Sequence, residues 1–289
     1  MSLLMASRRP GREAGATLPK SFTACVTPTY EGSGVTTHPS VVDMGRPWNG
    51  FRWWLADTPF PNDDDDYENP SIWGSNDRIN WTVPAGLVNP IDPMPPSGYN
   101  SDTELVYDPD EGRMVCLWRP YVGGGVMEAA VSTNGNSWHH QGELTRPTEG
   151  WGVSPAVWRT GPGEWHMWHF GGPALPVKYT ASSPLGPWTW VGTCTLTGND
   201  PGNRWHGDVI RWGSVWLGVF AHHTTRAVYP MSSADGMTWE VGATLPGTAY
   251  RPAILPSTVP DHIDLWAGGN GGKTIYRRHH VSLWPGMHA

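Results

Sequence analysis

The 289-residue chain is poor in cysteine and in long apolar runs, and each shortage excludes a class of protein. Its three cysteines, Cys25, Cys116 and Cys194, are widely spaced and odd in number. This pattern excludes a disulfide framework and a cysteine-based zinc site, and it predicts buried free thiols. The apolar run after Met1 is too short for a signal peptide, and no later stretch approaches about eighteen apolar residues. We therefore expect a soluble chain made in a cytoplasm, without membrane insertion.

Clustered positive charge and helical periodicity are also missing. The formal net charge is −7, and the 19 Lys and Arg residues are scattered, so we expect no nucleic-acid partner. No long stretch repeats its apolar residues at the helical period, which predicts almost no helix. The chain has instead 36 Gly, 29 Pro and 19 Trp, a composition suited to many turns and to aromatic packing between small sheets.

One short phrase, a tight turn that leads into a tryptophan, recurs along the chain. Four copies begin with serine and occupy residues 75–81, 132–138, 182–188 and 233–239. A degenerate fifth copy runs from Arg278 to Trp284. A unit repeated every 40–50 residues or so, with several short strands in each copy, is typical of a β-propeller. The repeats therefore predict five blades.

Three strands of each blade can be assigned from aromatic and β-branched runs separated by turn residues. First strands are predicted near residues 38–44, 103–108, 154–159, 207–212 and 251–256. Second strands are predicted at 52–56, 114–118, 165–168, 215–219 and 263–266, and third strands at 70–73, 128–131, 177–180, 227–230 and 273–276. The sequence thus predicts an all-β fold, a five-bladed propeller of four-stranded antiparallel blades.

The domain boundaries follow from the same repeat. Residues 21–289 are predicted to form a single propeller domain, and the polar residues 1–20 a flexible N-terminal arm. Little sequence remains after Tyr276 for a full outer strand. The segment from Ser21 to Tyr30 is therefore expected to add a strand to the last blade and close the ring.

The first part of the propeller resembles a group of tailed-bacteriophage minor tail or minor structural proteins. The resemblance is carried by residues 38–41, 49–56, 58–62, 67–72, 75–77, 79–81 and 101–109, and it is close over about residues 38–120. It implies a virion protein, with other tail or capsid proteins as partners and host cell-surface glycan as a ligand.

The wider architecture resembles the five-bladed propellers of arabinanase-like glycoside hydrolases of family 43. In those enzymes an Asp in blade one is the general base, an Asp in blade two tunes and orients, and a Glu in blade three is the general acid. This chain places His38 and Ser154 at the first and third positions, and only blade two keeps carboxylates, Asp102 and Glu104. The comparison argues against hydrolysis by that mechanism and leans against an enzyme.

Polar and aromatic residues near the strand ends are expected to meet at one mouth of the central channel. They are His38, Asp57, Glu68, Asn69, Asp102, Glu104, Arg119, Tyr121, Trp151, Ser154, Trp205, His206, Asp208, His222, His223, Tyr250 and Arg251. Such a mouth suits a sugar, because aromatic faces cover the apolar side of a pyranose and charged groups bind its hydroxyls. The alternative is that these groups bond one another and plug the channel.

Two groups of residues raise the question of a metal, although the sequence assigns no cofactor. The acidic run Asp63–Asp66 offers oxygen ligands to Ca²⁺, but it lacks the spacing of a calcium loop, which favours a solvated loop. His38 and His206 are candidates for a metal inside the channel, although no spacing requires one. In the doublets 139–140, 222–223 and 279–280, neighbours on a strand point to opposite faces, so each doublet offers one ligand at most.

Two hypotheses for function remain. The first is a virion structural protein whose propeller is a non-catalytic interaction module for host glycan, with binding residues His38, Arg119, Trp151, Trp205, His206 and Arg251. Trp151 and Trp205 would be its stacking platforms. The second is an arabinanase-like glycoside hydrolase with a rearranged carboxylate site drawn from Asp102, Glu104, Asp208 and Glu68. The residues found at positions 38 and 154 favour the first hypothesis.

Overall fold

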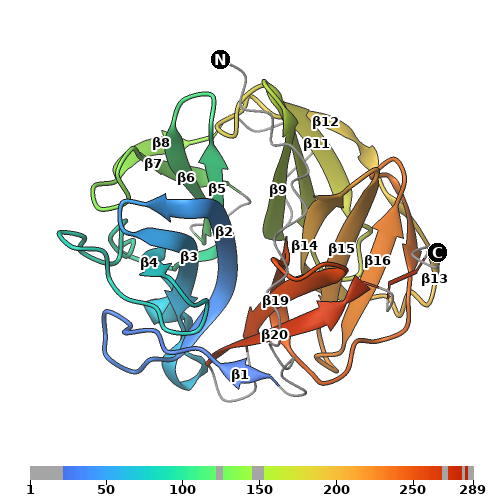
Figure 1. Ribbon diagram of the computed structural model, residues 1–289, viewed down its shortest axis with the longest axis horizontal. Coiled ribbons are helices and arrows are strands. Elements are labelled where there is room, and N and C mark those ends of the chain that lie inside the picture. Colours follow the sequence, from blue (N-terminus) through green and yellow to red (C-terminus); the bar gives the residue numbers. More distant parts are fainter. Residues whose placement is uncertain (1–21, 122–125, 145–152, 269–272, 282–283, 286–289) are drawn as a thin grey trace.

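The computed structural model describes residues 22–121, 126–144, 153–268, 273–281 and 284–285, which form a five-bladed β-propeller with its blades in a ring (Figure 1). Residues of all five first strands line one cavity of the central channel. Blade I contains β2 (Thr36–Trp48), β3 (Phe51–Pro59) and β4 (Ser71–Ser75). Blade II contains β5 (Asn100–Asp108), β6 (Arg113–Pro120), β7 (Glu128–Ser132) and β8 (His139–Glu143). Blade III contains β9 (Val153–Gly161), β10 (Glu164–Phe170), β11 (Val177–Ala181) and β12 (Thr189–Thr193).

The last two blades each borrow a strand from elsewhere in the chain. Blade IV contains β14 (Arg204–Trp212), β15 (Val215–His222), β16 (Val228–Ser233) and β17 (Thr238–Val241), with β13 (Thr195–Gly198) added in parallel to β17. Blade V contains β18 (Tyr250–Pro256), β19 (His262–Gly268), β20 (Thr274–His280) and β1 (Thr23–Ala24). The predicted fold class and the positions of the first, second and third strands are confirmed.

Two blades depart from the four-stranded pattern. Blade I has three strands, and its outer position is held only by a bridge between Gly74 and Thr82. Pro84 follows closely and lacks the N–H that a longer ladder needs, so the strand cannot extend. Blade IV has five strands because β13, the connection that follows blade III, pairs with its outer edge.

The ring is closed by the N-terminal segment, as predicted. β1 pairs antiparallel with β20, and the Cys25 amide donates to the Thr274 carbonyl at 2.7 Å. The next residue, Val26, exchanges backbone hydrogen bonds with the blade I turn at Ile79 and Trp81. The first segment of the propeller therefore joins the last blade to the first.

The repeated phrase forms the turn between the third and fourth strands, and its side chains explain why it recurs. In blade IV the Ser233 hydroxyl accepts from the amides of Asp235 and Gly236, while Asp235 Oδ1 accepts from Met237 and Thr238. Blades I and II repeat this pattern from Ser75 with Asp77 and from Ser132 with Asn134. Side chains thus satisfy the amides of a tight turn.

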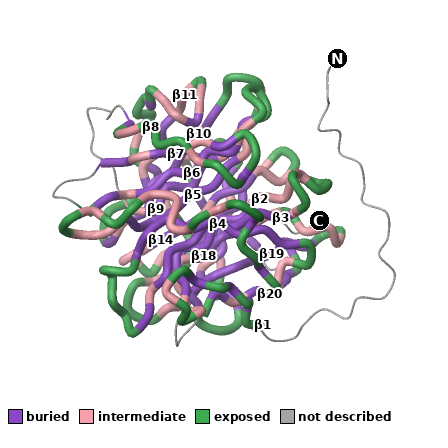
Figure 2. The backbone as a smooth tube through the Cα atoms, turned by 90° about the vertical axis from the view of Figure 1, so that its left-hand side faces the viewer, coloured by how far each residue is buried: buried purple, intermediate pink, exposed green. Residues whose placement is uncertain are grey.

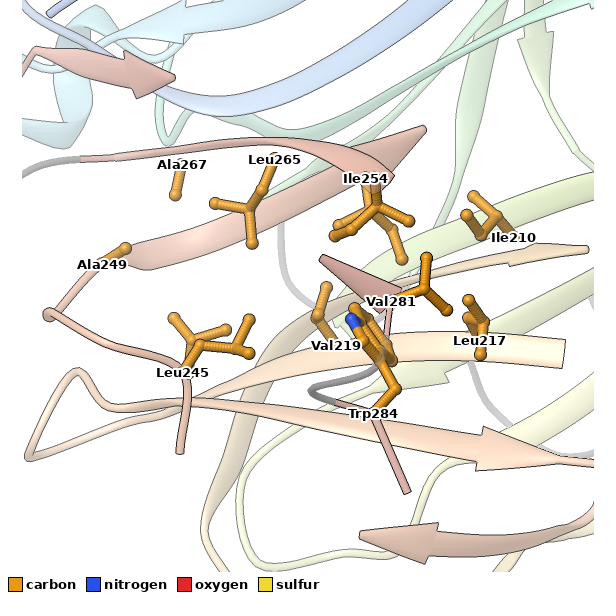
Figure 3. Close-up of a cluster of buried hydrophobic side chains, with 12 residues drawn as sticks. Ile210, Leu217, Val219, Leu245, Ala249, Ile254, Leu265, Ala267, Val281 and Trp284 are labelled. Carbon is orange, nitrogen blue, oxygen red and sulfur yellow. The ribbon is translucent and has the colours of Figure 1, made fainter. Parts of the chain in front are cut away.

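The tryptophans pack between neighbouring blades. Trp81, Trp188, Trp239 and Trp284 are buried, and Trp138 is partly buried. Five apolar clusters fill the spaces between adjacent blades. Figure 3 shows one of them, in which Ile210 and Leu217 of blade IV face Ile254 and Leu265 of blade V. Burial is concentrated on the strands around the channel, whereas the outer turns are exposed (Figure 2).

Helix is almost absent from the described residues, as predicted. They contain two single-turn 3-10 helices, η1 (Pro61–Asp63) and η2 (Asp65–Tyr67), and no helix that is long and apolar enough to cross a membrane. The predicted free thiols are also confirmed, because Cys25, Cys116 and Cys194 are all buried and unpaired. The predicted arm, residues 1–20, lies outside the described residues.

Candidate functional site

Each of the five first strands bends at the channel mouth, and one residue with a left-handed backbone marks each bend. These residues, whose φ angles lie between 49° and 57°, are His38, Asp102, Ser154, His206 and Arg251. The register between first and second strands shifts at or beside every one of them. A bulge of this kind re-aims a side chain, and an L-residue in this conformation costs on the order of 1–3 kcal/mol. The fold thus directs five side chains, one from each blade, toward the same mouth.

Three of these five side chains form a candidate metal-binding cluster. Nδ1 of His206 lies 2.9 Å from Oδ1 of Asp102, and Nε2 of His38 lies 3.2 Å from the same oxygen. The Ser154 hydroxyl donates to that oxygen at 3.0 Å and also contacts Nδ1 of His206. The three ligand atoms, one from each of the two histidines and the aspartate, lie within 4.8 Å of one another. Imidazole and carboxylate are ligands that transition metals accept in this combination.

The protonation states of the cluster fit a divalent cation. Burial, helped by Arg251, lowers the pKa of His206 to about 3 and that of His38 well below its usual value, so both imidazoles are neutral. Burial would raise the pKa of Asp102, but the hydrogen bond from the neutral His206 ring and the positive charge of Arg119 hold it well below the ordinary value. Nε2 of His206 is buried without a hydrogen-bond partner, and Nε2 of His38 makes no hydrogen bond in spite of its 3.2 Å approach to Asp102. Buried polar atoms are ordinarily paired, so these two nitrogens suit a ligand to the cluster.

A second carboxyl group, Glu68, stands beside the cluster. Its Oε1 lies 3.6 Å from Nδ1 of His38 and accepts from Nη1 of Arg251 at 3.2 Å. Thr58 Oγ1 lies 3.0 Å from Nδ1 of His38, and Arg251 contacts the same nitrogen. Burial outweighs the attraction of Arg251 and raises the pKa of Glu68 to about 8. Glu68 and Asp102 are therefore neighbouring carboxyl groups with opposite pKa shifts, as catalytic acid and base pairs often are.

The two other carboxylates predicted for catalysis lie deeper and act between blades. Glu104 accepts from the Ser40 hydroxyl and from the Val157 amide of blade III. Asp208 accepts from its neighbour Val209 and from the Ile254 amide of blade V. Burial raises the pKa of both carboxyl groups, that of Asp208 to about 7. Their oxygens are occupied by three backbone amides and the Ser40 hydroxyl, so these residues fill the channel and tie neighbouring blades together.

An aromatic wall rises from the cluster on the side of blades IV and V. The Trp205 ring lies 5.3 Å from that of His206 and 4.9 Å from that of His223. Tyr250 meets His206 edge-on at 5.1 Å, and the Arg226 guanidinium lies 3.6 Å from the Tyr250 ring centroid. Aromatic rings beside polar groups are typical of sugar sites.

The predicted mouth residues only partly converge. Those that line the cavity at the mouth are His38, Asp102, Glu104, Ser154, His206, Asp208 and Arg251. Arg119 contacts Asp102, and Trp205 contacts His206. Trp151 lies outside the described residues. The roles of all these residues in ligand binding stay predictions.

Other predicted candidates are occupied elsewhere. Asp57 accepts from the Trp73 indole at 2.6 Å, and the His222 ring accepts from the amides of a turn at Thr224 and Thr225. Asp64, Asp65 and Asp66 lie close together but are exposed, and Asp64 accepts from the Asp66 amide. Among the described residues, the histidine doublets do not join the channel cluster.

The sequence predicted His38 and His206 as a metal pair and placed Asp102 at the same mouth, but it did not indicate Asp102 as a metal ligand, and it missed Tyr99 and Arg226. A usable signal for Asp102 exists. His38, Asp102 and His206 each lie three residues before a buried apolar residue of the first strand, at positions 41, 105 and 209. Aligning the strands on that apolar position would have placed all three in one ring. Tyr99 and Arg226 lie in connections outside the repeat pattern, so no such alignment finds them.

Comparison with known proteins finds carbohydrate enzymes among the proteins that this chain is similar to. No protein-family profile matches the chain. The chain is 37% identical over 126 residues to the A type blood N-acetyl-alpha-D-galactosamine deacetylase of Flavonifractor plautii, a match that covers 41% of this chain and 16% of that protein. The chain therefore matches about a sixth of the length of this curated relative.

Solved structures share the fold. A crystal structure of an N-acetylgalactosamine deacetylase from F. plautii, in complex with blood group B trisaccharide, superposes with a TM-score of 0.72 at 21% identity, covering 90% of this chain and 94% of that one. The GH43_1 enzyme of Xanthomonas citri complexed with xylotriose gives 0.64 at 10% identity, over 90% and 89%. CoXyl43, a GH43 β-xylosidase/α-arabinofuranosidase from a compost metagenome, gives 0.61 at 9% identity, over 85% and 91%. At these identities the structures show the fold alone, and they confirm the predicted likeness to family 43 propellers.

The expectation of a non-catalytic virion module is wrong. The curated relative is an enzyme that acts on a sugar, and the structural neighbours are carbohydrate-processing enzymes. These comparisons give no support to the bacteriophage or minor-tail assignment. The lack of carboxylates at positions 38 and 154 argues against one glycosidase mechanism and not against other chemistry. The structure places two histidines and an aspartate among the five bends.

Proposed function

We propose that this protein is a metal-dependent deacetylase that removes the acetyl group from an N-acetylated amino sugar of a glycan. The observation that carries the proposal is the buried cluster of His38, Asp102 and His206 at the channel mouth. The identity with a curated N-acetylgalactosamine deacetylase supports the substrate class. The aromatic wall at Trp205 and Tyr250 supplies surfaces on which a pyranose ring can stack.

The reaction adds water across an amide bond, so that the C–N bond breaks, a C–O bond forms, and acetate and a free amino sugar leave. His38, Asp102 and His206 would hold a divalent cation, which would supply Lewis-acid polarisation of the acetyl carbonyl. Glu68 is the residue placed to move protons, because it stands beside His38 and its pKa of about 8 lies close to neutral pH. It takes a proton from the attacking water and returns one to the departing nitrogen. Arg251 keeps the Glu68 side chain in place.

The test measures acetate and free amine released from N-acetylgalactosaminides and N-acetylglucosaminides, with reducing sugar followed in the same samples. We expect acetate release by the parent protein, loss after chelation, and recovery when a divalent metal is returned. His206→Ala should abolish metal retention and activity. Glu68→Gln should lower kcat by about 10²–10⁴-fold while metal content stays unchanged. His140→Ala is the matched control, because His140 is an exposed histidine on an outer strand, paired with Glu128. Full acetate release by His206→Ala would refute the proposal.

Glycoside hydrolysis with a rearranged carboxylate site is the second candidate. It is favoured by the opposite pKa shifts of Glu68 and Asp102, which a glycosidase requires of its acid and base. The same assay separates the two functions. Reducing sugar released without acetate, and abolished by both Glu68→Gln and Asp102→Asn, would assign hydrolysis of the glycosidic bond instead.

A further inference from the structure

We propose that Arg119 is a positioning residue that fixes the Asp102 carboxylate in the orientation the metal cluster requires. The inference rests on the proposed function, since it concerns the same cluster. Arg119 lies outside the ring of five bends, and we assign it a role in metal affinity rather than in substrate contact.

The two oxygens of Asp102 have separate tasks. Oδ1 faces the cluster, where it lies within 3.2 Å of His38, His206 and the Ser154 hydroxyl. Oδ2 faces away and accepts from Nε of Arg119 at 2.8 Å and from the Ser101 hydroxyl at 3.2 Å. The same guanidinium donates through Nη2 to the Ser101 hydroxyl at 3.0 Å. Arg119 therefore binds both Oδ2 of Asp102 and the hydroxyl of the neighbouring Ser101. This leaves Oδ1 of Asp102 directed at the two histidines.

The bend in β5 makes such support necessary. Asp102 is fully buried and has a φ of 57°, and the pairing of β5 with β6 is shifted between Ser101 and Glu104. The backbone ladder therefore does not clamp Asp102 directly. Arg119 lies opposite Ser101, the last paired residue before the shift. Its side chain reaches from regular strand across the bulge and supplies the restraint that the ladder does not. Groups that hold a metal ligand in this way commonly contribute about 10–100-fold in metal affinity.

Arg119 is itself held by two tyrosines. Tyr99 and Tyr121 stack in parallel with ring centroids 4.8 Å apart. The guanidinium carbon lies 5.8 Å from the Tyr99 centroid and 5.9 Å from that of Tyr121, and the Tyr99 side chain interacts with it. The Tyr121 amide donates to the Tyr99 carbonyl, which fixes the spacing of the pair. The planar guanidinium of Arg119 is thus held by aromatic contact on one side and by hydrogen bonds on the other.

The experiment titrates the metal-free full-length protein with Zn²⁺ by calorimetry and compares Arg119→Lys and Arg119→Gln with the parent. Lys keeps the charge but cannot make the two-point contact. Positioning predicts that both variants weaken Zn²⁺ binding by about 10–100-fold. Tyr99→Phe, which keeps the ring and loses the hydroxyl, should weaken binding severalfold and serves if the arginine variants fold poorly. The matched control is Arg113→Lys, since Arg113 lies on the same strand and pairs with Asp108 of β5 away from the cluster.

Each outcome decides the matter. Weaker Zn²⁺ binding in both arginine variants, with melting temperatures close to that of Arg113→Lys, supports positioning. Parent-like affinity in Arg119→Lys with loss in Arg119→Gln would show that Arg119 only neutralises charge, and it would overturn the inference while the proposed function stands. Parent-like affinity in all variants would overturn it as well. Failure of the parent itself to bind Zn²⁺ would overturn the metal cluster and the inference together.

Discussion

At the scale of single residues, buried carboxyl groups of this protein differ in charge because their neighbours differ. Asp102 has two histidines and Arg119 around it, and its pKa falls well below the ordinary value. Asp57 is equally buried but receives only neutral donors, chiefly the Trp73 indole, so burial raises its pKa to about 7. One of its oxygens has no hydrogen-bond partner. Asp102 is a charged member of the candidate site, whereas Asp57 destabilises the fold at neutral pH.

Replacing Asp57 with asparagine should therefore change how stability depends on pH. Between about pH 4 and 7 the folded parent holds a proton on Asp57 that the unfolded chain releases, so its stability falls as the pH rises. The asparagine side chain does not titrate, and its amide oxygen can still accept from Trp73. We expect Asp57→Asn to gain on the parent through this range, by up to about 4 kcal/mol above pH 7. Urea unfolding at half-unit pH steps measures it.

The control for this prediction is Asp110→Asn. Asp110 is exposed, and its hydrogen bonds with Arg159 lower its pKa, so its substitution should act in the opposite sense. Parallel pH profiles for the parent and Asp57→Asn would show that Asp57 is ionised in the folded protein at neutral pH.

The sequence predicted some residues of the site and not others, and the reason is physical. His38, Asp102 and His206 stand in the repeated first strands, so their place at the mouth follows from the repeat. Which of them approach one another depends on the bend in each strand, and a positive φ at a residue other than glycine leaves no clear mark in the sequence. The partners Arg226 and Tyr99 come from connections whose path is set by tertiary packing.

At the scale of elements, the strands were predictable because a turn leading into a tryptophan recurs in each repeat, and in blades I, II and IV the same side-chain hydrogen bonds cap it. Residues of that turn also pack against a neighbouring blade. The Gly236 carbonyl accepts from the Trp168 indole of blade III at 2.8 Å, and a Cβ on Gly236 would lie 2.9 Å from that ring and 2.8 Å from Nζ of Lys178. Blades I and IV were the exceptions in strand number. In blade I a proline-containing connection replaces the outer strand, and in blade IV the connection from blade III adds one, and the turn pattern reveals neither.

Gly236→Ala should cost more stability than Gly213→Ala. Both glycines have positive φ, 74° and 58°, so both variants bear the backbone strain of about 1–2 kcal/mol. Only Gly236 is packed against a neighbouring blade, whereas a Cβ on Gly213 meets nothing within 4 Å. Overpacking should add about 1–3 kcal/mol at Gly236. Denaturant unfolding of the two variants measures the difference, and equal losses would mean that the turn does not press on Trp168.

At the scale of the whole molecule, stability depends on closing the ring. The five blades share cores with both neighbours, and β1 supplies the link between blade V and blade I. The ring-closing bonds are few, but they cover edges that would otherwise be open to another chain. The predicted N-terminal arm, residues 1–20, offers a matched comparison because its removal leaves β1 in place.

A chain that begins at Thr27 should lose about 3 kcal/mol or more, because it lacks the pairing of β1 with β20, three further backbone hydrogen bonds made by Cys25 and Val26, and the buried Cys25. It should also associate as concentration rises, since the edge of β20 is exposed. A chain that begins at Ser21 should melt like the parent. Melting temperature and sedimentation at several concentrations test both statements. Equal melting of the two truncated chains would show that β1 does not hold the ring.

In the ring of five left-handed bends, the position of each side chain is set separately from its chemical identity. The backbone fixes the position and direction of residues 38, 102, 154, 206 and 251, and the strands behind them are held by cores that these side chains do not enter. Exchanging one of them leaves the scaffold intact and replaces one chemical group at the mouth. A propeller of this kind can therefore keep its scaffold while the chemistry of the mouth changes, with each blade contributing one side chain to a shared set of contacts.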